Sequence, residues 1–213
     1  IESSPTNKNL QYINLLEVKK YITEIKENNL GTKLIGLTGG EPFMNPNIIY
    51  ILKYLLENKF KVLVLSNGMR PIEIKFKDLL TLPNLNNLTI RISVDHFKKK
   101  GHERIRGSNT WKQLIRNLIW LSNNGLNLNI ASKIKPDESE KIIREGFYKL
   151  FKKIKLNIDP YNKNELIIFP IMDYEKTSIE ITQDCWSVLD KSPESVMCSN
   201  SRMIIKRKDE INT

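Results

Sequence analysis

The stretch KLIGLTGGEPFMNP, residues 33–46, joins an apolar run of strand length to a turn that holds two glycines, an acid and a proline. An apolar run that ends in such residues is typical of a buried strand. The two glycines leave main-chain groups open to a ligand, and Pro42 restricts the chain direction and removes one N–H donor. The stretch therefore predicts a strand that ends at a binding turn.

Strand-length runs alternate with helix-period stretches through most of the chain. Apolar residues recur at helical spacing near residues 15–25, 48–55, 72–81, 111–118 and 136–151. The predicted strands between them are residues 33–38, 61–66, 87–95 and 127–134. This repetition predicts an α/β fold with a mostly parallel sheet and crossover helices, either a barrel or a doubly wound sheet.

The rhythm changes beyond about residue 153. Short strand candidates follow there, separated by polar or proline-containing links, at residues 153–159, 165–170, 178–182 and 202–207. We therefore predict a core domain over residues 1–152 and an irregular C-terminal extension over residues 153–213.

Composition limits the class of protein. The chain has 213 residues and a net charge of +10, which is compatible with an acidic partner such as nucleic acid or with an ordinary solvated surface. No apolar run is long enough to span a membrane, and two cysteines are too few for a disulfide framework. A soluble, cytoplasmic protein is predicted, and the first residue, Ile1, suggests a fragment.

Three turns are expected to meet at the ligand-binding edge of the sheet, because ligands gather at the carboxyl ends of parallel strands. The first is residues 38–42, where exposed carbonyls and the Glu41 carboxylate suit a cation such as an ammonium group. The second is residues 66–68, and the third is residues 93–95, where Ser93 and Asp95 point to the same face. Ordinary turns or end-of-strand caps explain each of these stretches equally well when it is taken alone.

The segment after the third turn adds two further polar candidates. His102 and Arg106 are predicted to lie in a loop before a helix that begins near Asn109 or Thr110. An arginine in such a loop could pair bidentately with a carboxylate. A lone histidine is more often structural than catalytic.

Together these motifs resemble the radical S-adenosylmethionine (SAM) enzymes. LTGGEPF resembles the Gly-Gly-Glu-Pro motif of that family, and ISVD followed by HERIRG resembles the segment after its fourth strand. The resemblance covers about residues 1–150. The tail at residues 184–208 is more weakly similar to C-terminal regions of members that carry additional cysteines.

The resemblance implies a partial (β/α)6 TIM-like barrel that binds SAM and a [4Fe–4S] cluster at its strand ends. The implied SAM-binding residues are Gly39, Gly40, Glu41, Pro42, Asn67, Ser93, Asp95 and Arg106. In this assignment the turn at residues 39–42 receives the methionine ammonium, and Arg106 pairs with the carboxylate. The cluster would reduce SAM to a 5′-deoxyadenosyl radical that abstracts a substrate hydrogen.

One departure from the family is large. The Cys-x3-Cys-x2-Cys motif that supplies the cluster thiolates is absent from this sequence, and a chain cut after that motif would also lack the first barrel strand. Either the chain is a degenerate homologue or, as we expect, it is cut just after the motif. Cys185 and Cys198 are candidate ligands of an auxiliary Fe–S cluster or unremarkable thiols.

Three functional hypotheses follow. The first is a radical SAM enzyme that acts on a peptide or small molecule and takes electrons from a donor such as flavodoxin or ferredoxin. The second is a non-catalytic, basic nucleic-acid-binding domain, although its aromatic residues are not interleaved with basic ones. The third is a degenerate domain that only binds SAM or a partner. The catalytic residues and the substrate are not readable from the sequence.

Overall fold

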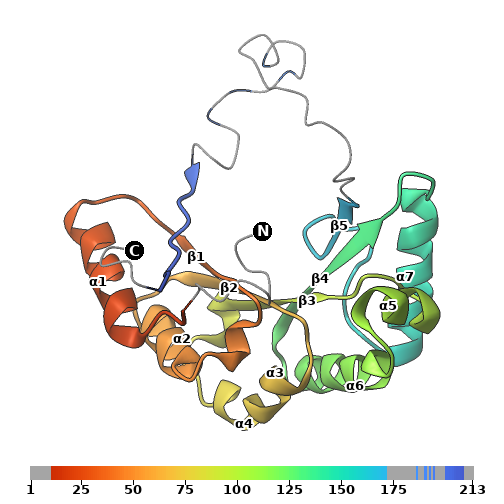
Figure 1. Cartoon of the computed structure of the whole chain (residues 1–213), viewed down its shortest axis with the longest axis horizontal. Helices are drawn as coiled ribbons and strands as arrows, with labels where there is room; N and C mark the ends of the chain where they lie inside the picture. The colour runs from red at the N-terminus through yellow and green to blue at the C-terminus, as the bar shows by residue number, and fades with distance from the viewer. Residues whose placement is uncertain are drawn as a thin grey trace.

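A curved, five-stranded parallel sheet forms the centre of the protein, seen here in a computed structural model that describes residues 11–171, 186, 190, 192, 194 and 200–208. The strands are adjacent in sequence order: β1 (Leu34–Leu37), β2 (Lys61–Ser66), β3 (Leu88–Ser93), β4 (Asn127–Ile134) and β5 (Leu166–Pro170). Figure 1 shows the sheet curled into an open half barrel, with helices along its convex side. The predicted α/β partial barrel is thus confirmed.

Helices connect successive strands, as the apolar periodicity predicts. They are α1 (Leu15–Glu27), α2 (Ile48–Glu57), α3 (Arg70–Ile74), α4 (Phe76–Leu79), α5 (Lys99–Arg106), α6 (Thr110–Asn123) and α7 (Glu140–Ile154), with 3-10 turns η1 (Pro42–Met44) and η2 (Leu85–Asn87). The helix α1 begins with a capping box, in which Asn14 accepts from the Glu17 N–H and Glu17 accepts from the Asn14 N–H.

The hydrophobic core lies between the convex face of the sheet and these helices. Alternate residues of β2, β3 and β4 are buried, as the strand period of two requires. Ile90 and Ile92 of β3 are fully buried, together with Leu52 of α2 and Leu114 of α6. The intervening strand residues face the concave side, so the half barrel leaves that side available for a ligand.

Some predicted elements differ from the structure. The single helix predicted at residues 72–81 is two short helices, α3 and α4, because Lys75 has a non-helical ψ of 3° between them. The helix predicted from Pro136 begins only after Ser139, since residues 135–138 form a turn in which the Glu138 carboxylate accepts from the Lys135 N–H.

The strand candidates in the C-terminal extension have different outcomes. Residues 165–170 contain β5, which pairs in parallel with β4 and extends the sheet. Residues 155–159 and 202–206 have no strand structure, and residues 178–182 lie outside the described part of the chain. Thus part of the predicted extension belongs to the half barrel.

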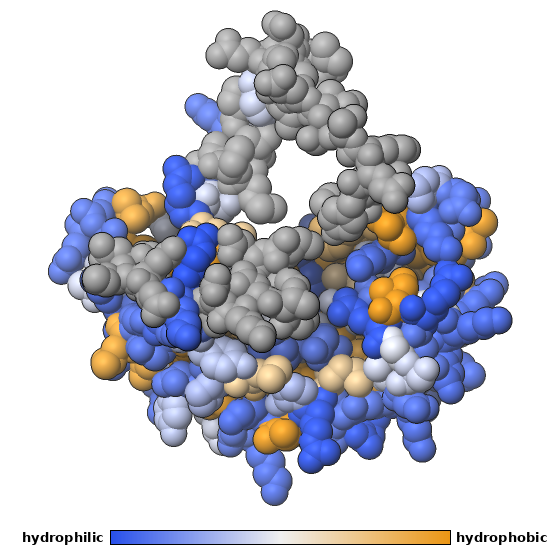
Figure 2. All heavy atoms as spheres, viewed as in Figure 1, coloured by the Kyte–Doolittle hydropathy of each residue, from blue (hydrophilic) through white to orange (hydrophobic). Residues whose placement is uncertain are grey.

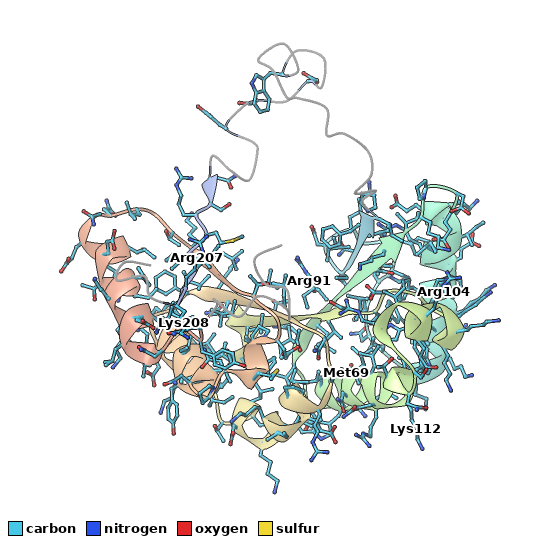
Figure 3. The ribbon with its side chains drawn as sticks, in the orientation of Figure 1. Met69, Arg91, Arg104, Lys112, Arg207 and Lys208 are labelled. Atoms are coloured by element: carbon cyan, nitrogen blue, oxygen red, sulfur yellow. The ribbon has the colours of Figure 1, made fainter. Side chains whose placement is uncertain are left out.

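Residues 200–208 return to the first helix. The Lys206 carbonyl accepts from the Gln11 N–H at 3.1 Å, and the Lys206 ammonium lies 2.7 Å from the Glu17 carboxylate. Arg207 and Lys208 lie beside α1 and β1 in Figure 3. The C-terminal part of the chain is therefore attached to the opposite edge of the sheet from β5.

Hydrophilic side chains cover most of the visible face of the described residues in Figure 2, broken by small apolar patches. None of the helices among the described residues has the length and apolar character needed to cross a bilayer.

A close contact at Gly146 of α7 gives a first prediction. A Cβ at this position would lie 2.5 Å from two ring atoms of Phe97. Glycine to alanine in a helix ordinarily stabilises by about 1 kcal/mol, but overpacking of this kind costs about 1–3 kcal/mol. We expect Gly146→Ala to lower the free energy of unfolding by about 1–2 kcal/mol, measured by urea denaturation.

The Phe97→Leu background supplies the control for that substitution. Leucine removes the aromatic ring that the new Cβ would meet, so the same Gly146→Ala change should cost measurably less in that background. An equal loss in both backgrounds would show that the ring contact is not the cause.

Candidate functional site at the strand ends

The three predicted turns lie next to one another. Because β1, β2 and β3 are neighbouring parallel strands, residues 38–42, 66–68 and 93–95 follow the carboxyl ends of adjacent strands. We call the backbone of residues 38–40 together with Asn67, Ser93, Asp95 and Arg106 the strand-end site.

The Glu41 carboxylate connects the first turn to the second. One oxygen accepts from the Ser66 hydroxyl at 2.9 Å and from the Phe43 N–H at 3.1 Å, and the other accepts from the Asn67 N–H at 2.7 Å. Glu41 is only 6% exposed, and burial raises the pKa of its carboxyl group, although the three donors act in the opposite direction. Glu41 therefore holds two strand ends together.

The backbone before Glu41 is open. Residues 38–40 are exposed. Gly39 has a backbone φ of +137°, which residues with a side chain rarely adopt. A Cβ at Gly39 would meet no atom of the described residues within 4 Å. Pro42, in contrast, is buried in η1. The open surface of the first turn is therefore its glycine backbone.

Residues of α6 contact the second turn and fix its position. Gly68 has a φ of +71°, and a Cβ there would lie 2.8 Å from side-chain atoms of Ile92 and Leu114. The Asn117 amide donates to the Gly68 carbonyl at 2.9 Å. Asn67 uses its own side-chain oxygen to accept from the Met69 N–H. These contacts leave the turn little freedom to move.

Asp95 and Arg106 form an ion pair. The Arg106 guanidinium donates through Nε and Nη2 to the two Asp95 oxygens, the second contact at 3.4 Å. The Asp95 side chain is 2% exposed and the Arg106 side chain 33%. The prediction that residues 102 and 106 lie in a loop is wrong, since both are in α5, whose side chain at 106 reaches back to the end of β3.

His102 lies beneath this pair. It is 1% exposed, its ring centroid is 5.6 Å from that of Trp111, and neither ring nitrogen has a hydrogen-bond partner among the described residues. Burial lowers the pKa of His102, and the Arg106 charge adds to this effect while Asp95 opposes it. The folded protein therefore holds His102 neutral.

This lowered pKa predicts acid sensitivity. Below the ordinary pKa of 6.5 the unfolded chain binds a proton at His102 that the folded chain does not, so acid favours unfolding. Between pH 7.5 and 5.5 we expect the unfolding free energy to fall by about 1 kcal/mol more in the wild type than in His102→Phe. Urea denaturation across this range measures the difference.

His96 requires a control, because burial lowers its pKa as well. His96→Asn should remove a separate part of the pH dependence and leave the His102 contribution in place. Parallel pH profiles for the wild type and His102→Phe would contradict the assignment.

The concave side of the sheet contains a cavity of about 160 Å³ next to the strand-end site. Its lining residues come from β2 to β5 and the adjoining segments: Leu65, Arg91, Ser93, Asp95, Arg106, Ala131, Ser132, Lys133 and Phe169. Ser93, Asp95 and Arg106 of the predicted site thus face a common space, whereas the Glu41 side chain is enclosed behind it.

The part of the chain that the structure describes contains no evident metal centre. No group of three or more His, Cys, Asp or Glu side chains there could hold a metal ion. Cys185 and Cys198, the candidate auxiliary ligands, lie outside the described residues. The described residues therefore do not fit an iron–sulfur cluster.

Two residues of the site were missed in the sequence. Asn117 lies on the apolar face of α6 beside Leu114, Leu118 and Leu121, and an amide in such a stripe was a signal for a buried hydrogen bond. Arg91 alternates with Ile90 and Ile92 in β3, and a charge at an inward strand position was a signal for a ligand.

Comparison with known families and proteins identifies related sequences. The family profile described as the Radical SAM superfamily matches residues 3–145. The antilisterial bacteriocin subtilosin biosynthesis protein AlbA of Bacillus subtilis is 28% identical over 135 residues, which are 63% of this chain and 29% of that protein. The GTP 3′,8-cyclase of Haemophilus ducreyi is 24% identical over 116 residues, 54% of this chain and 32% of the cyclase. The chain therefore aligns with about a third of the length of these relatives.

Solved structures share the fold. Streptococcus suis SuiB bound to its precursor peptide SuiA aligns with 88% of this chain and 40% of SuiB, with a TM-score of 0.61 and 13% identity. SuiB bound to S-adenosylmethionine gives a TM-score of 0.59 at 15% identity, covering 84% of this chain and 39% of SuiB. At this level of identity the likeness concerns the half barrel alone.

Proposed function

Since the chain belongs to the Radical SAM superfamily, we propose that it forms the SAM-binding part of an enzyme that abstracts hydrogen from a substrate. When bound, SAM and a reduced [4Fe–4S] cluster supply the 5′-deoxyadenosyl radical for this chemistry. The family match supports the first of the three hypotheses from the sequence.

The single observation that carries the proposal is the open glycine backbone at the same edge of the sheet as a cavity lined by Ser93, Asp95 and Arg106. Exposed carbonyls at residues 38–40 suit the SAM ammonium, and Glu41 holds this turn in position. Asn67 lies at the edge, Ser93 and Asp95 are assigned to the ribose or carboxylate region, and Arg106 to the carboxylate. The open space at Gly39 fits such a ligand.

Arg106 is already paired with Asp95, so only the exposed part of its side chain is available to a ligand. The ion pair orients the guanidinium at the mouth of the cavity and compensates the buried Asp95 charge. The third of the Arg106 side chain that remains exposed is the part assigned to the SAM carboxylate. Cluster ligands lie outside the described residues in this proposal, and Cys185 and Cys198 are assigned to an auxiliary cluster.

We propose a peptide as the substrate. AlbA is a biosynthesis protein of the bacteriocin subtilosin, and SuiB is bound to a precursor peptide in one of its structures. The electron donor in this proposal is a flavodoxin or ferredoxin. In this proposal the core extends beyond residue 152 to include β5, and the rest of the C-terminal segment takes part in binding the substrate.

The full-length protein, reconstituted with iron and sulfide without oxygen and reduced with dithionite, tests the activity. We expect 5′-deoxyadenosine to accumulate from SAM, as detected by liquid chromatography. A protein that shows the absorption of a complete cluster but releases no 5′-deoxyadenosine would overturn the proposal.

Gly39→Ala tests the binding residues directly. The new Cβ occupies the open space assigned to SAM without meeting an atom of the described residues within 4 Å, while the φ of +137° strains the backbone of any residue with a side chain. We expect the dissociation constant for SAM to rise at least about tenfold, equivalent to about 1.4 kcal/mol, by equilibrium dialysis. Gly31→Ala is the matched control, because Gly31 also has a positive φ (+66°) and open space around it but precedes β1, away from the strand ends. Equal SAM affinities for the two variants would contradict the assignment.

A further inference from the structure

Arg91 lies on the concave face of β3, in the interior of the half barrel. Its strand neighbours Ile90 and Ile92 are fully buried on the other face, so the Arg91 side chain extends toward the cavity. In register, Arg91 is opposite Leu65 of β2 and Asn129 of β4. Figure 3 shows the side chain on the open side of the sheet.

The Arg91 guanidinium has no partner among the described residues. Its Nε is buried without a hydrogen bond, and no ion pair involves it within residues 11–171 or 200–208. Burial lowers the pKa of Arg91. Because a buried N–H without a hydrogen-bond acceptor is unfavourable, such a group is normally hydrogen-bonded. An anion from outside these residues would supply the missing hydrogen-bond acceptor and counter-charge.

The cavity around Arg91 is positive. Lys133 of β4 also lines it and forms no ion pair with any described residue, while Asp95, its acidic residue, is occupied by Arg106. The Ser93 hydroxyl adds a polar group, and Leu65 and Phe169 provide apolar walls. This combination suits a ligand that carries a carboxylate on an apolar stem.

We propose that Arg91, assisted by Lys133, binds a carboxylate of the substrate inside the half barrel. This inference deepens the proposed function and rests on it for the identity of the substrate as a peptide. Arg91 precedes Ser93 by two residues, about 6.6 Å along the strand, so the carboxylate lies deeper than the part of the site assigned to SAM. The carboxylate is either an acidic side chain or the C-terminus of the peptide.

Nuclear magnetic resonance of the full-length protein labelled with ¹⁵N-arginine tests this binding without SAM or catalysis. Arg91→Lys identifies the Arg91 Nε signal, because lysine lacks it. The probes are N-acetylglutamate N-methylamide for an acidic side chain, N-acetylalanine for a chain terminus and N-acetylglutamine N-methylamide as the neutral match. We expect one or both carboxylates to shift the signal at concentrations at least about tenfold below those the neutral probe needs.

Variants assign the effect to the cavity. Because both Arg91 variants lack the Arg91 Nε signal, their affinities and that of the wild type are compared by isothermal titration calorimetry. Arg91→Met should weaken binding of the better carboxylate at least about tenfold, and Arg91→Lys a few-fold, because lysine keeps the charge but not the planar guanidinium. Arg104→Met is the control, since Arg104 is an exposed arginine of α5 that does not line the cavity. If Arg91→Met does not fold, the wild-type titration and Arg91→Lys still decide the result.

Three results would overturn the inference. They are equal binding of the neutral and charged probes, unchanged binding in both Arg91 variants, and tighter binding of inorganic phosphate than of either carboxylate. Failure of the proposed function is separable from these, because it would appear as no SAM binding and no 5′-deoxyadenosine while the carboxylate titration succeeds.

Discussion

Replacing Glu41 by alanine is expected to lower the free energy of unfolding by about 3 kcal/mol. The substitution leaves the N–H groups of Phe43 and Asn67 and the buried Ser66 hydroxyl without their acceptor, and each unsatisfied group costs about 1–3 kcal/mol. Part of this loss is offset, because the variant no longer buries a carboxylate whose pKa burial has raised. Urea denaturation at pH 7 measures the change.

Ser66→Ala is the matched control for Glu41→Ala. It removes one donor to the carboxylate and the acceptor of the Gly68 N–H, so a smaller loss of about 1–2 kcal/mol is expected. Glu41→Ala should also weaken SAM binding, since the glycine turn loses its connection to β2. A Glu41→Ala protein as stable as Ser66→Ala would show that the carboxylate does not hold the strand ends together.

Replacing Arg106 by methionine is the second large perturbation. It leaves the Asp95 carboxylate, 2% exposed, without its counter-charge, and breaking a buried pair in this way costs about 3–5 kcal/mol. Arg106 is itself one-third exposed, so solvent screening reduces the expected loss to about 2 kcal/mol. Chemical denaturation of the variant and the wild type gives this value.

The double variant Asp95→Asn/Arg106→Met isolates the charge pair. Because it removes both charges, it should recover a large part of the stability lost in Arg106→Met. Arg106→Lys keeps a positive charge but not the bidentate contact. Its free energy of unfolding is expected to lie between those of the wild type and Arg106→Met. No recovery in the double variant would mean that Arg106 acts through packing instead.

The fold was largely predictable because its signals are local. Apolar residues recur with a period of two in β3 and at helical spacing in α2 and α6, so strands and helices could be recognised in order. The helix α5 was missed because its sequence, KKGHERIR, has a single buried residue, His102, and no apolar stripe. Its helical conformation depends on packing against neighbouring elements.

The candidate site was predictable in position but not in its contacts. Residues 39–42, Asn67, Ser93 and Asp95 could be placed at strand ends from the order of the elements alone. The interaction between Glu41 and Ser66 joins residues 25 apart, and that between Asn117 and Gly68 joins residues 49 apart. Neither pair has a spacing that a sequence pattern could reveal.

The sequence by itself determined the alternation of strands and helices, and with it the edge at which the polar turns meet. Only the tertiary structure decided that Glu41 is enclosed by its donors, that Arg106 pairs with Asp95 and that Arg91 has no described partner. The physical reason is that periodicity records which face of an element is buried, whereas partners across strands depend on register and on the curvature of the sheet. In KLIGLTGGEPFMNP, residues 33–46, the glycine backbone is therefore the open surface and the carboxylate is its internal support.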